Sequence, residues 1–391
     1  MSESLGVCYP RGFEASAIAA GLKASGKLDL ALVVNTGRHV KSAGVFTSNR
    51  VVAAPVEYTR KLMKTASISH VIVNSGNANA CTGQRGVADV ALTVAAVAEA
   101  CQIAPDTIGV CSTGVIGEYL DIEKLGRAVP QLVKALSCEG GSDASRAIMT
   151  TDTVAKTVEL DCGGWRIGGM AKGAGMLAPA LATMLCVITL DAVVDERALQ
   201  RALTHAVNRS FDRLDTDGCM STNDSVIVLA SGESGKKVSE SELTAQLTDA
   251  CVELTRSLQN DAEGASHTID INVRGASAES AAVAVGRTVA RSALVKTAIF
   301  GNDPNWGRIL SQIGTLDEQT APFDPSKVDV AINGIEICRS GSIGEPKKLV
   351  DIASNRHVAI DITLHAGDAN ATIYTTDLTH DYVHENSAYT T

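Results

Sequence analysis

Aromatic residues are scarce in this sequence of 391 residues, at 3% of the chain, although hydrophobic residues make up 45%. A surface that stacks nucleic-acid bases needs aromatic rings, so this scarcity disfavours such a function and predicts an aliphatic core. Basic residues are also outnumbered, with 34 Lys and Arg against 44 Asp and Glu and a net charge of −10. This balance argues against nucleic-acid binding as the main function.

Signals for metal binding, secretion and membrane insertion are missing as well. The ten cysteines never form CxxC and the eight histidines never form HExxH, so we predict no metal site and expect reduced thiols. The N-terminus has no basic segment followed by an apolar one, so we expect no signal peptide and a cytoplasmic protein. Eighteen uncharged residues follow Lys172, but Gly173, Gly175 and Pro179 crowd their first half, which predicts a loop entering a buried segment.

Strand signals dominate the first third of the chain and return near its end. The segments 30–37, 43–49 and 69–83 end in Asn, Ser or Gly, residues that leave backbone amides available to a ligand. Two later segments, 269–274 and 358–364, alternate apolar with polar residues. This alternation predicts strands with one solvated face, in antiparallel or mixed sheets.

Helices are predicted over three segments. The segment 86–101 is Ala-rich and carries charge only at Asp89 and Glu99, so we expect a largely buried helix. The segments 195–211 and 240–258 are amphipathic and are expected to cover a sheet. Strands and helices are intermixed without regular βα alternation, and no linker marks a domain boundary. The predicted fold class is therefore α+β, with layered mixed sheets covered by helices.

Two glycine-rich segments, 168–176 and 231–239, do not match a nucleotide-binding loop. Neither contains GxxxxGK[ST] or GxGxxG after a strand, so we expect their glycines to form tight turns. Lys172 is nevertheless a candidate site residue, because it precedes the long uncharged run and is at risk of desolvation. Desolvation lowers the pKa of a lysine amine and makes the amine useful in a site.

Two segments rich in hydroxyl groups provide further candidates. In CSTGVIG at 111–117, Thr113 and Gly114 can present a hydroxyl and a backbone amide to a developing oxyanion, although a glycine-permitted turn explains the same pattern. In IMTTDT at 148–153, three threonines surround Asp152, and a solvated strand end or hydroxyl-capped turn is the simpler interpretation. Neither segment by itself establishes a site.

Thr183 lies in the apolar run PALATMLCVITL at 179–190, where packing in a strand is the ordinary role of a threonine. The alternative is a nucleophile whose own α-amine, freed by cleavage of the preceding peptide bond, acts as the base. An α-amine titrates at about pH 8, so it is partly available as a base at neutral pH. Ala182 is small and leaves room for the close approach that self-cleavage needs.

Six separated motifs together resemble the ornithine acetyltransferase family. They occur in the family's order in a chain of the right length, and the resemblance runs from about Gly12 to Thr391. The motifs are KGAGMLAPALATM at 172–184, STGVIG at 112–117, TTDT at 150–153, GNDPNWGR at 301–308, NSGNAN at 74–79 and NSAYTT at 386–391.

The resemblance implies a self-cleaving acetyltransferase of arginine biosynthesis with a layered α/β sandwich fold. Cleavage at Ala182–Thr183 would give an alpha chain, 1–182, and a beta chain, 183–391, which stay together and commonly form a heterotetramer. Acetyl would pass from N-acetylornithine to Thr183 and then to glutamate in a ping-pong cycle. Some members also accept acetyl-CoA, and we expect this of the present chain. No cofactor, nucleic-acid partner or membrane partner is expected.

The matching positions imply a role for each candidate residue. Thr183 is the implied nucleophile, and Thr113 and Gly114 form the implied oxyanion hole. Glu263 suits an ammonium of ornithine, although without the resemblance it is more simply a solvated charge at a helix end. The implied substrate-binding residues are Thr150, Lys172, Thr183, Glu263, Asn386 and Thr391.

The two implied pieces differ in charge. Residues 1–182 contain 17 basic and 15 acidic residues, whereas residues 183–391 contain 17 basic and 29 acidic residues. Opposite net charges would help the pieces associate, but salt screens such attraction, so burial of a shared core must dominate.

Two other functions are compatible with parts of the sequence. A self-cleaving aminopeptidase or amidase of related fold would pass the acyl group to water, but such relatives use Ser at the cut, and Thr183 disfavours them. A protein that kept the fold only to bind small molecules or to assemble is disfavoured by the intact nucleophile and oxyanion donors.

Overall fold

The computed structural model describes residues 4–178 and 184–388, which form two compact units. Unit 1 contains the chain up to Asp212 together with residues 219–258. Unit 2 contains residues 213–218 and the described residues from Gln259 onward. The second of these segments begins in the last turn of a long helix. The predicted cut after Ala182 lies outside the described residues.

The first sheet of unit 1 has four strands in the order β1-β2-β4-β5. The pairs β1–β2 and β2–β4 are antiparallel, and the pair β4–β5 is parallel, so the sheet is mixed as predicted. The structure confirms the strands expected within 30–37 and 69–83. The strands are β1 (Phe13–Ile18), β2 (Leu30–Asn35), β4 (His70–Asn77) and β5 (Ile108–Val115).

The second sheet of unit 1 has five strands in the order β3-β9-β8-β7-β6. Only β8 and β9 run parallel, and the other neighbours are antiparallel. The run after Pro179 continues into a fully buried strand, β8, as expected for a loop entering a buried segment. The strands are β3 (Lys41–Phe46), β6 (Lys156–Asp161), β7 (Arg166–Lys172), β8 (Leu185–Leu190) and β9 (Ser225–Ala230).

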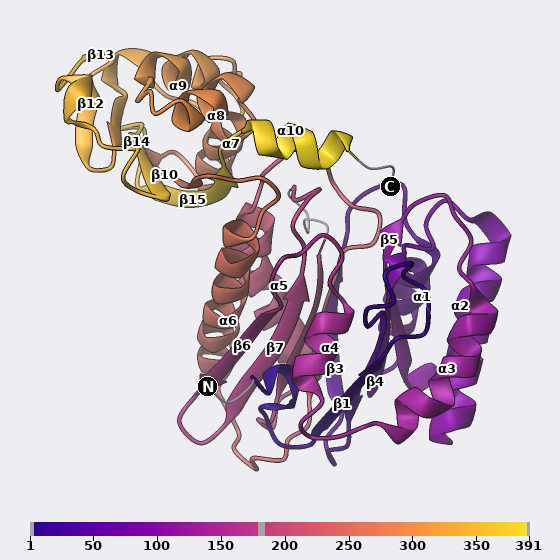
Figure 1. The fold of residues 1–391 in the computed structure, drawn as a ribbon. Helices are drawn as coiled ribbons and strands as arrows, with labels where there is room; N and C mark the ends of the chain where they lie inside the picture. The colour runs from indigo at the N-terminus through magenta and orange to yellow at the C-terminus, as the bar shows by residue number, and fades with distance from the viewer. Residues whose placement is uncertain (1–3, 179–183, 389–391) are drawn as a thin grey trace. The chain divides into compact units, whose positions relative to one another are not determined.

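The two sheets of unit 1 pack directly on each other through an aliphatic core (Figure 1). Ala31, Val33 and Val73 of the first sheet meet Val187 and Ile227 of the second in this core. The opposite face of the first sheet is covered by two helices, which bury a second apolar cluster against it. These helices are α2 (Gly83–Cys101) and α3 (Ile122–Lys134).

The expectation that helix α2 is largely buried is wrong. Val90, Val94 and Val97 are buried, but Val87 and Leu92 are about half exposed at 50% and 54%. Alanine is tolerated on either face of a helix, so an Ala-rich composition does not reveal which face is solvated. Helix α2 is therefore amphipathic.

The two helices predicted as amphipathic are confirmed as α5 (Glu196–Arg209) and α6 (Glu240–Asn260). Asp195 caps α5 by accepting hydrogen bonds from two backbone amides of its first turn. On β3, the carbonyl of Gly44 accepts a hydrogen bond from Gln200 Nε2 at 3.1 Å. The shorter helices of unit 1 are α1 (Ala54–Leu62) and α4 (Gly141–Ala147).

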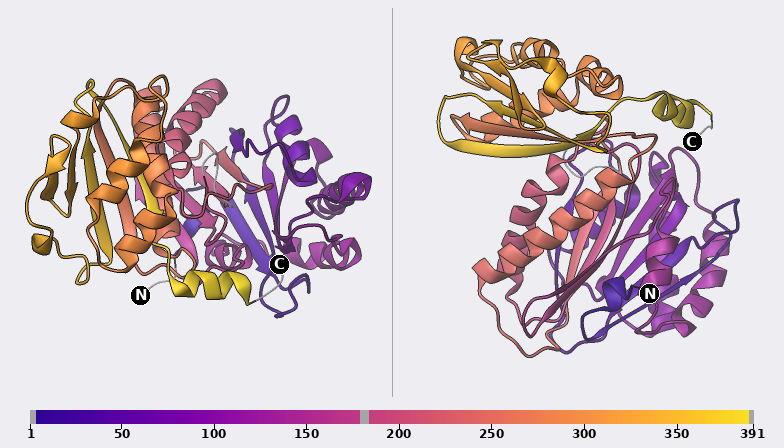
Figure 2. Two further views of the ribbon diagram at one scale, coloured as in Figure 1. Left: turned by 90° about the horizontal axis from the view of Figure 1, so that it is seen from above. Right: turned by 60° about the vertical axis from the view of Figure 1, so that its left-hand side comes forward.

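Unit 2 is one mixed sheet, in the order β13-β12-β11-β14-β10-β15, with helices gathered on one face (Figure 2). Its aliphatic core lies between that face and α7, α8 and α9. On β14, Val358, Ile360 and Ile362 are fully buried, which confirms the predicted alternation. The strands are β10 (Thr268–Ala276), β11 (Asp329–Ile332), β12 (Ile335–Arg339), β13 (Ser342–Ile343), β14 (His357–Thr363) and β15 (Ala369–Thr376), and the helices are α7 (Glu279–Ala290), α8 (Ala293–Phe300), α9 (Trp306–Ile313) and α10 (His380–Ser387).

The glycines of the two glycine-rich segments have different roles. Gly232 and Gly235 have φ of +71° and +70°, which confirms tight turns after β9. Gly168 and Gly169, however, lie inside strand β7, so the turn predicted there is wrong. A Cβ on Gly168 would lie 2.1 Å from the carbonyl oxygen of Gly6, so this glycine permits close backbone approach.

All ten cysteines lie among the described residues and are free thiols there. Within residues 4–178 and 184–388, no helix has both the length and the apolar character needed to span a membrane.

Candidate active site

The Thr113–Gly114 pair lies at the end of strand β5 rather than in a separate turn. Thr113 is buried, and it pairs with Ser75 of β4 across the parallel ladder. Gly114 has φ of +132°, and a Cβ there would lie 2.3 Å from the carbonyl carbon of Gly76. The close approach of two backbones at this irregular strand end is what requires glycine.

Lys172 ends strand β7 and reaches across to this pair. Its side chain is buried, and its Nζ donates a hydrogen bond to Thr113 Oγ1 at 3.1 Å. The predicted desolvation of Lys172 is therefore confirmed, and two predicted site residues separated by 59 positions are brought together. A buried ammonium beside a hydroxyl can stabilise negative charge that develops on a bound carbonyl oxygen.

Asp152 is the main buried anion beside this pair, although its sequence context suggested a solvated strand end. Its carboxylate contacts Lys156 Nζ at 2.6 Å, and both side chains are fully buried. The backbone amides of Thr150 and Gly173 also donate to it, at 2.9 and 2.7 Å. Burial alone would raise the pKa of Asp152, but Lys172 and Lys156 outweigh this effect and lower it to about 2.

The interpretation of the segment around Asp152 as a solvated turn is wrong, because the Asp152 carboxylate is buried with Lys156 and also accepts the backbone amide of Gly173. Thr150 itself is exposed, and its backbone amide rather than its side chain makes the hydrogen bond to Asp152. The sequence shows only a carboxylate flanked by hydroxyl groups. The buried lysines are what keep Asp152 charged inside the fold.

Asp224 is a second buried acid, and no sequence pattern singled it out. Its Oδ1 accepts the backbone N–H of Met184 at 3.0 Å, which is the amide that follows Thr183 in the chain. Its Oδ2 is buried without a hydrogen-bond partner among the described residues. Desolvation raises the pKa of Asp224 well above its ordinary value, although the charge of Lys172 opposes the shift.

Asn223, next to Asp224, connects the two sheets at the site. Its Nδ2 donates to the carbonyl oxygens of Ala78 at 2.6 Å and Ser112 at 2.9 Å. The carbonyl of Ser112 belongs to the peptide that leads into Thr113, so this bond fixes the orientation of the strand end. Buried amides satisfied in this way restrict a site to one geometry.

Glu263 and Asn386 are brought together in unit 2. Asn386 Nδ2 donates to Glu263 Oε2 at 3.1 Å, across 123 positions of sequence. Thr379 Oγ1 fixes this arrangement, because it donates to the Gly264 carbonyl at 2.5 Å and accepts the Tyr382 amide at the start of α10. Glu263 is partly exposed and follows α6, as expected for a helix-end charge that can still meet a ligand.

Three other predicted site residues, Ala182, Thr183 and Thr391, lie outside the described residues. Thr113, Gly114, Thr150 and Lys172 belong to unit 1, whereas Glu263 and Asn386 belong to unit 2. Among the described residues, no group of three or more His, Cys, Asp or Glu side chains has an arrangement that could hold a metal ion.

A buried ammonium, a hydroxyl and a glycine amide at a strand end are typical of acyl-transfer enzymes, in which they stabilise an oxyanion. Comparison of this chain with models of known families identifies one family. Residues 14–391 match the model of the ArgJ family. The chain belongs to the ArgJ family, and the resemblance inferred from the six motifs is confirmed.

Two curated relatives illustrate the extent of the similarity. The arginine biosynthesis bifunctional protein ArgJ of Bifidobacterium longum is 51% identical over 390 residues, covering 98% of this chain and 100% of the relative. The protein of the same name from Streptomyces coelicolor is also 51% identical, over 385 residues, with coverage of 98% and 100%. A solved ornithine acetyltransferase from Mycobacterium tuberculosis, complexed with ornithine, is 48% identical over 46% of this chain and 96% of that chain, with a TM-score of 0.44.

We predict that Asp152→Asn destabilises the protein by about 3–5 kcal/mol at neutral pH, because Lys156 is left as a buried charge without its counterion. The pKa of Asp152 is lowered on folding, so its carboxylate stabilises the native state above pH 4 and this contribution disappears as the pH falls toward 2. The difference between wild type and variant in free energy of unfolding, measured by urea titration, should therefore shrink over this range.

The matched control is Asp143→Asn, because the Asp143–Arg146 ion pair is about half exposed. Its removal should cost less than about 1 kcal/mol and show little dependence on acid pH. Equal effects of the two substitutions would contradict a structural role for the buried Asp152 charge.

Proposed function

We propose that this chain transfers an acetyl group from N-acetylornithine to glutamate in arginine biosynthesis, through an acetyl-Thr183 intermediate. The observation that carries this proposal is membership of the ArgJ family over almost the whole chain, together with the buried Lys172–Thr113 hydrogen bond where an oxyanion site is expected. The products are ornithine and N-acetylglutamate.

In the proposed first half-reaction, the α-amine of Thr183 removes the proton of its own hydroxyl, and the hydroxyl oxygen attacks the acetyl carbonyl. The carbonyl oxygen becomes an oxyanion, which the Thr113 hydroxyl and the Gly114 amide stabilise beside Lys172. The C–N bond then breaks, the proton passes to the leaving amine, and ornithine departs. In the second half-reaction the amine of glutamate attacks the acetyl ester and restores the Thr183 hydroxyl.

The two substrates share the amino-acid framework, so one set of residues can serve both halves of a ping-pong cycle. Glu263 would bind the side-chain ammonium of N-acetylornithine, with Asn386 holding the carboxylate of Glu263 in place. We assign substrate contacts also to Thr150, Lys172 and Thr391.

We further infer that the chain cleaves itself at Ala182–Thr183 and that the two pieces remain associated. The five-stranded sheet supports this inference, because its two strands from after the cut, β9 and β8, lie between strands from before the cut on both sides. Strand β8 pairs with β7 on one side and β9 on the other, while β9 pairs with β3. Residues 1–182 and 183–391 would therefore share one hydrogen-bonded sheet and core, and we propose a cytoplasmic heterotetramer of two alpha and two beta chains.

Asp224 would position the nucleophile. Its hydrogen bond to the Met184 amide holds the first peptide group after Thr183, and the raised pKa of its carboxyl limits the negative charge beside the developing oxyanion. Metal ions and organic cofactors have no step in this mechanism.

We expect Thr183→Ala to abolish both cleavage and acetyl transfer, because the variant lacks the hydroxyl that forms the ester. Denaturing gel electrophoresis should show one band at the full mass of 40.6 kDa, whereas wild type should give two bands. Thr183→Ser, which keeps a hydroxyl, is the matched control and should retain both reactions at reduced rate. An unprocessed wild type, or normal transfer by Thr183→Ala, would contradict the proposal, and release of acetate in place of N-acetylglutamate would favour an amidase.

Glu263→Gln should raise KM for N-acetylornithine by about 10- to 100-fold, since a hydrogen bond to a charged group contributes about 1.5–3 kcal/mol. KM for glutamate should change much less, because glutamate has no side-chain ammonium. Steady-state kinetics with each substrate varied in turn measures this difference, with the exposed Glu318→Gln as control. An equal rise in both KM values would show that Glu263 has a structural role only.

Incubation of wild type with acetyl-CoA and glutamate, without N-acetylornithine, should yield N-acetylglutamate. A thioester is a more reactive acetyl donor than an amide, and the same Thr183 ester would be formed. Chromatographic detection of the product measures the reaction, and Thr183→Ala should form none. Absence of product with wild type would restrict the enzyme to recycling acetyl groups.

A further inference from the structure

The loop between β1 and β2 in unit 1 is built around a buried carboxylate. Asp29, at the end of this loop, is fully buried. Its carboxylate accepts the backbone amides of Ala20 and Leu22, both at 2.6 Å, and that of Lys23 at 2.9 Å. The carbonyl oxygen of Asp29 accepts the amide of Ser75 at 2.9 Å, so the same residue joins the loop to strand β4. A carboxylate that accepts several amides holds a loop in one conformation.

Lys23 connects this loop to two other elements of unit 1. It is half-buried, and its Nζ donates hydrogen bonds to the carbonyl oxygens of Leu28 at 2.8 Å and Ala147 at 3.3 Å. The carbonyl of Ala147, at the end of α4, also accepts the hydroxyl of Ser75 at 2.5 Å. Lys23 and strand β4 therefore bind the same carbonyl group, and the loop, the helix end and the strand meet at one point.

The stem of Lys23 lies against the end of strand β4. A Cβ on Gly76 would lie 3.2 Å from Lys23 Cγ and 3.0 Å from the carbonyl oxygen of Leu22. On its other strand neighbour, β5, Gly76 pairs with Gly114 in the parallel ladder. Gly114 supplies the backbone amide of the proposed oxyanion hole, so the loop contacts the glycine on which that amide is packed.

The ammonium of Lys23 also interacts with the charged groups around the proposed site. Burial lowers the pKa of Lys23 to about 8, and the charges of Asp29 and Asp152 oppose this shift. The positive charges of Lys172 and Lys27 lower the pKa further. A change in the charge of Lys23 would therefore be felt by Asp152 and Lys172, because electrostatic interactions act equally on both partners.

We propose that Lys23 is a positioning residue of the acetyl-transfer site. This inference rests on the proposed function, and it assigns no contact between Lys23 and a substrate. Lys23 would hold the ends of β4 and β5 in the geometry in which the Gly114 amide meets an oxyanion. Its charge strengthens the two hydrogen bonds that it donates, since a charged donor forms stronger hydrogen bonds than a neutral amine.

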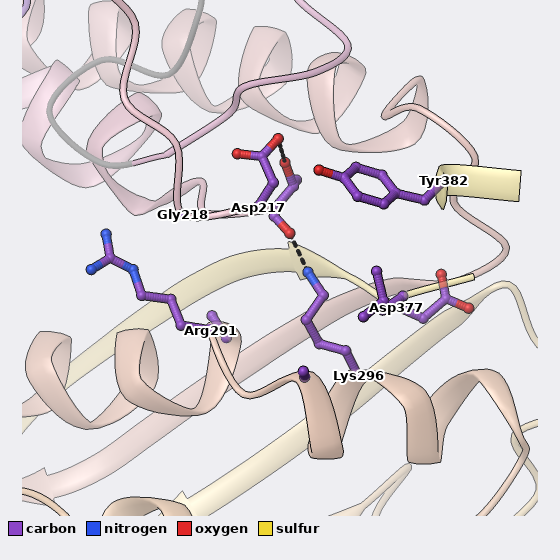
Figure 3. A pocket seen from close by; sticks show the side chains of 10 residues that line it. Asp217, Gly218, Arg291, Lys296, Asp377 and Tyr382 are labelled. Atoms are coloured by element: carbon purple, nitrogen blue, oxygen red, sulfur yellow. Dashed lines mark hydrogen bonds between the residues drawn. The ribbon is translucent and has the colours of Figure 1, made fainter. Parts of the chain in front are cut away.

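A second buried lysine offers a control for the loss of an ammonium inside the protein. Lys296 lines a cavity of about 270 Å³ in unit 2 and donates a hydrogen bond to the carbonyl oxygen of Thr216 (Figure 3). Burial lowers the pKa of Lys296 to about 8 as well. Neither Lys296 nor Thr216 has a role in the proposed reaction, so Lys296→Met removes a comparable buried charge without touching the strand ends of unit 1.

Hydrogen–deuterium exchange of the intact chain tests whether Lys23 holds these strand ends. Lys23→Met keeps the stem and removes the ammonium, so amides of residues 74–78 and 112–116 should exchange about tenfold faster than in wild type. The matched control is Lys27→Met, which changes an exposed lysine of the same loop. Lys27→Met and Lys296→Met should leave the exchange of both segments unchanged, and unchanged exchange in Lys23→Met would overturn the proposal.

Single-turnover kinetics tests the effect on the reaction. Ornithine release is measured with N-acetylornithine alone, before glutamate is added. In Lys23→Met the maximum rate should fall about 10- to 100-fold, because a displaced oxyanion donor stabilises the transition state less. The half-saturating concentration of N-acetylornithine should change less than about threefold, since Lys23 contacts no substrate. An unchanged maximum rate would leave Lys23 a structural role only, and an effect confined to half-saturation would make it a substrate-binding residue; either result contradicts the proposal.

Lys23→Arg provides a rescue that a merely structural role would not give. A guanidinium can donate to both carbonyls and stays charged at alkaline pH, whereas wild type loses the charge of Lys23 as the pH rises past about 8. The maximum rate of ornithine release should therefore fall above pH 8 in wild type and fall less in Lys23→Arg. The same alkaline pH profile in both proteins would exclude the charge of Lys23 from its positioning role.

Failure of this inference is distinguishable from failure of the proposed function. If wild type releases no ornithine, the proposed function is refuted, and the exchange measurement still decides whether Lys23 holds the strand ends. If Lys23→Met does not fold, the maximum rate and the pH profile of Lys23→Arg decide in its place.

Discussion

Burial of charge at the ends of strands β5 and β7 is the constraint on which the proposed acetyl-transfer site depends. Lys172 and Lys156 are both buried, and their charges lower the pKa of Asp152, whereas burial raises the pKa of Asp224. Lys172 places a buried positive charge next to Thr113. An oxyanion formed next to Thr113 would balance this charge, so the proposed site would favour a tetrahedral intermediate over a neutral substrate.

The scarcity of aromatic residues is consistent with the way this site is built. Two sheets pack face to face through side chains such as Val33, Val73 and Val187, and glycines at strand ends let backbones approach closely. Polar groups that cross between the sheets must then be fully satisfied, as Asn223 is by the carbonyls of Ala78 and Ser112. The aliphatic core holds the polar site in place without contributing chemistry to it.

Sequence patterns predicted the positions of helices and strands better than the burial and contacts of individual side chains. Alternation identified β10 and β14, and the lone charge of Lys172 before an apolar run correctly indicated burial. Composition failed for α2, since alanine does not distinguish an inner from an outer face. Composition also failed for Asp152 and Asp224, because a carboxylate among Ser, Thr and Asn looks solvated. The burial of these carboxylates depends on tertiary contacts such as the amide of Gly173 for Asp152 and the amide of Met184 for Asp224. Pairs such as Thr113–Lys172 and Glu263–Asn386 are too distant in sequence for local patterns to predict the contact between their members, and only the resemblance to the family placed them in one site.

The position of the proposed cut follows from the same architecture. Residues 173–184 connect β7 and β8, which are antiparallel neighbours, so this connection is needed to close a hairpin but not to hold either strand in the sheet. After cleavage, β7 would keep its pairing with β6 and β8 would keep its pairing with β9. Opening one loop changes the free energy of the chain little through loop entropy. The hydrogen bonds and the buried apolar area of two sheets contribute far more. A new N-terminus at Thr183 would therefore be released next to Met184, which Asp224 already holds, without dismantling the charged site that it requires.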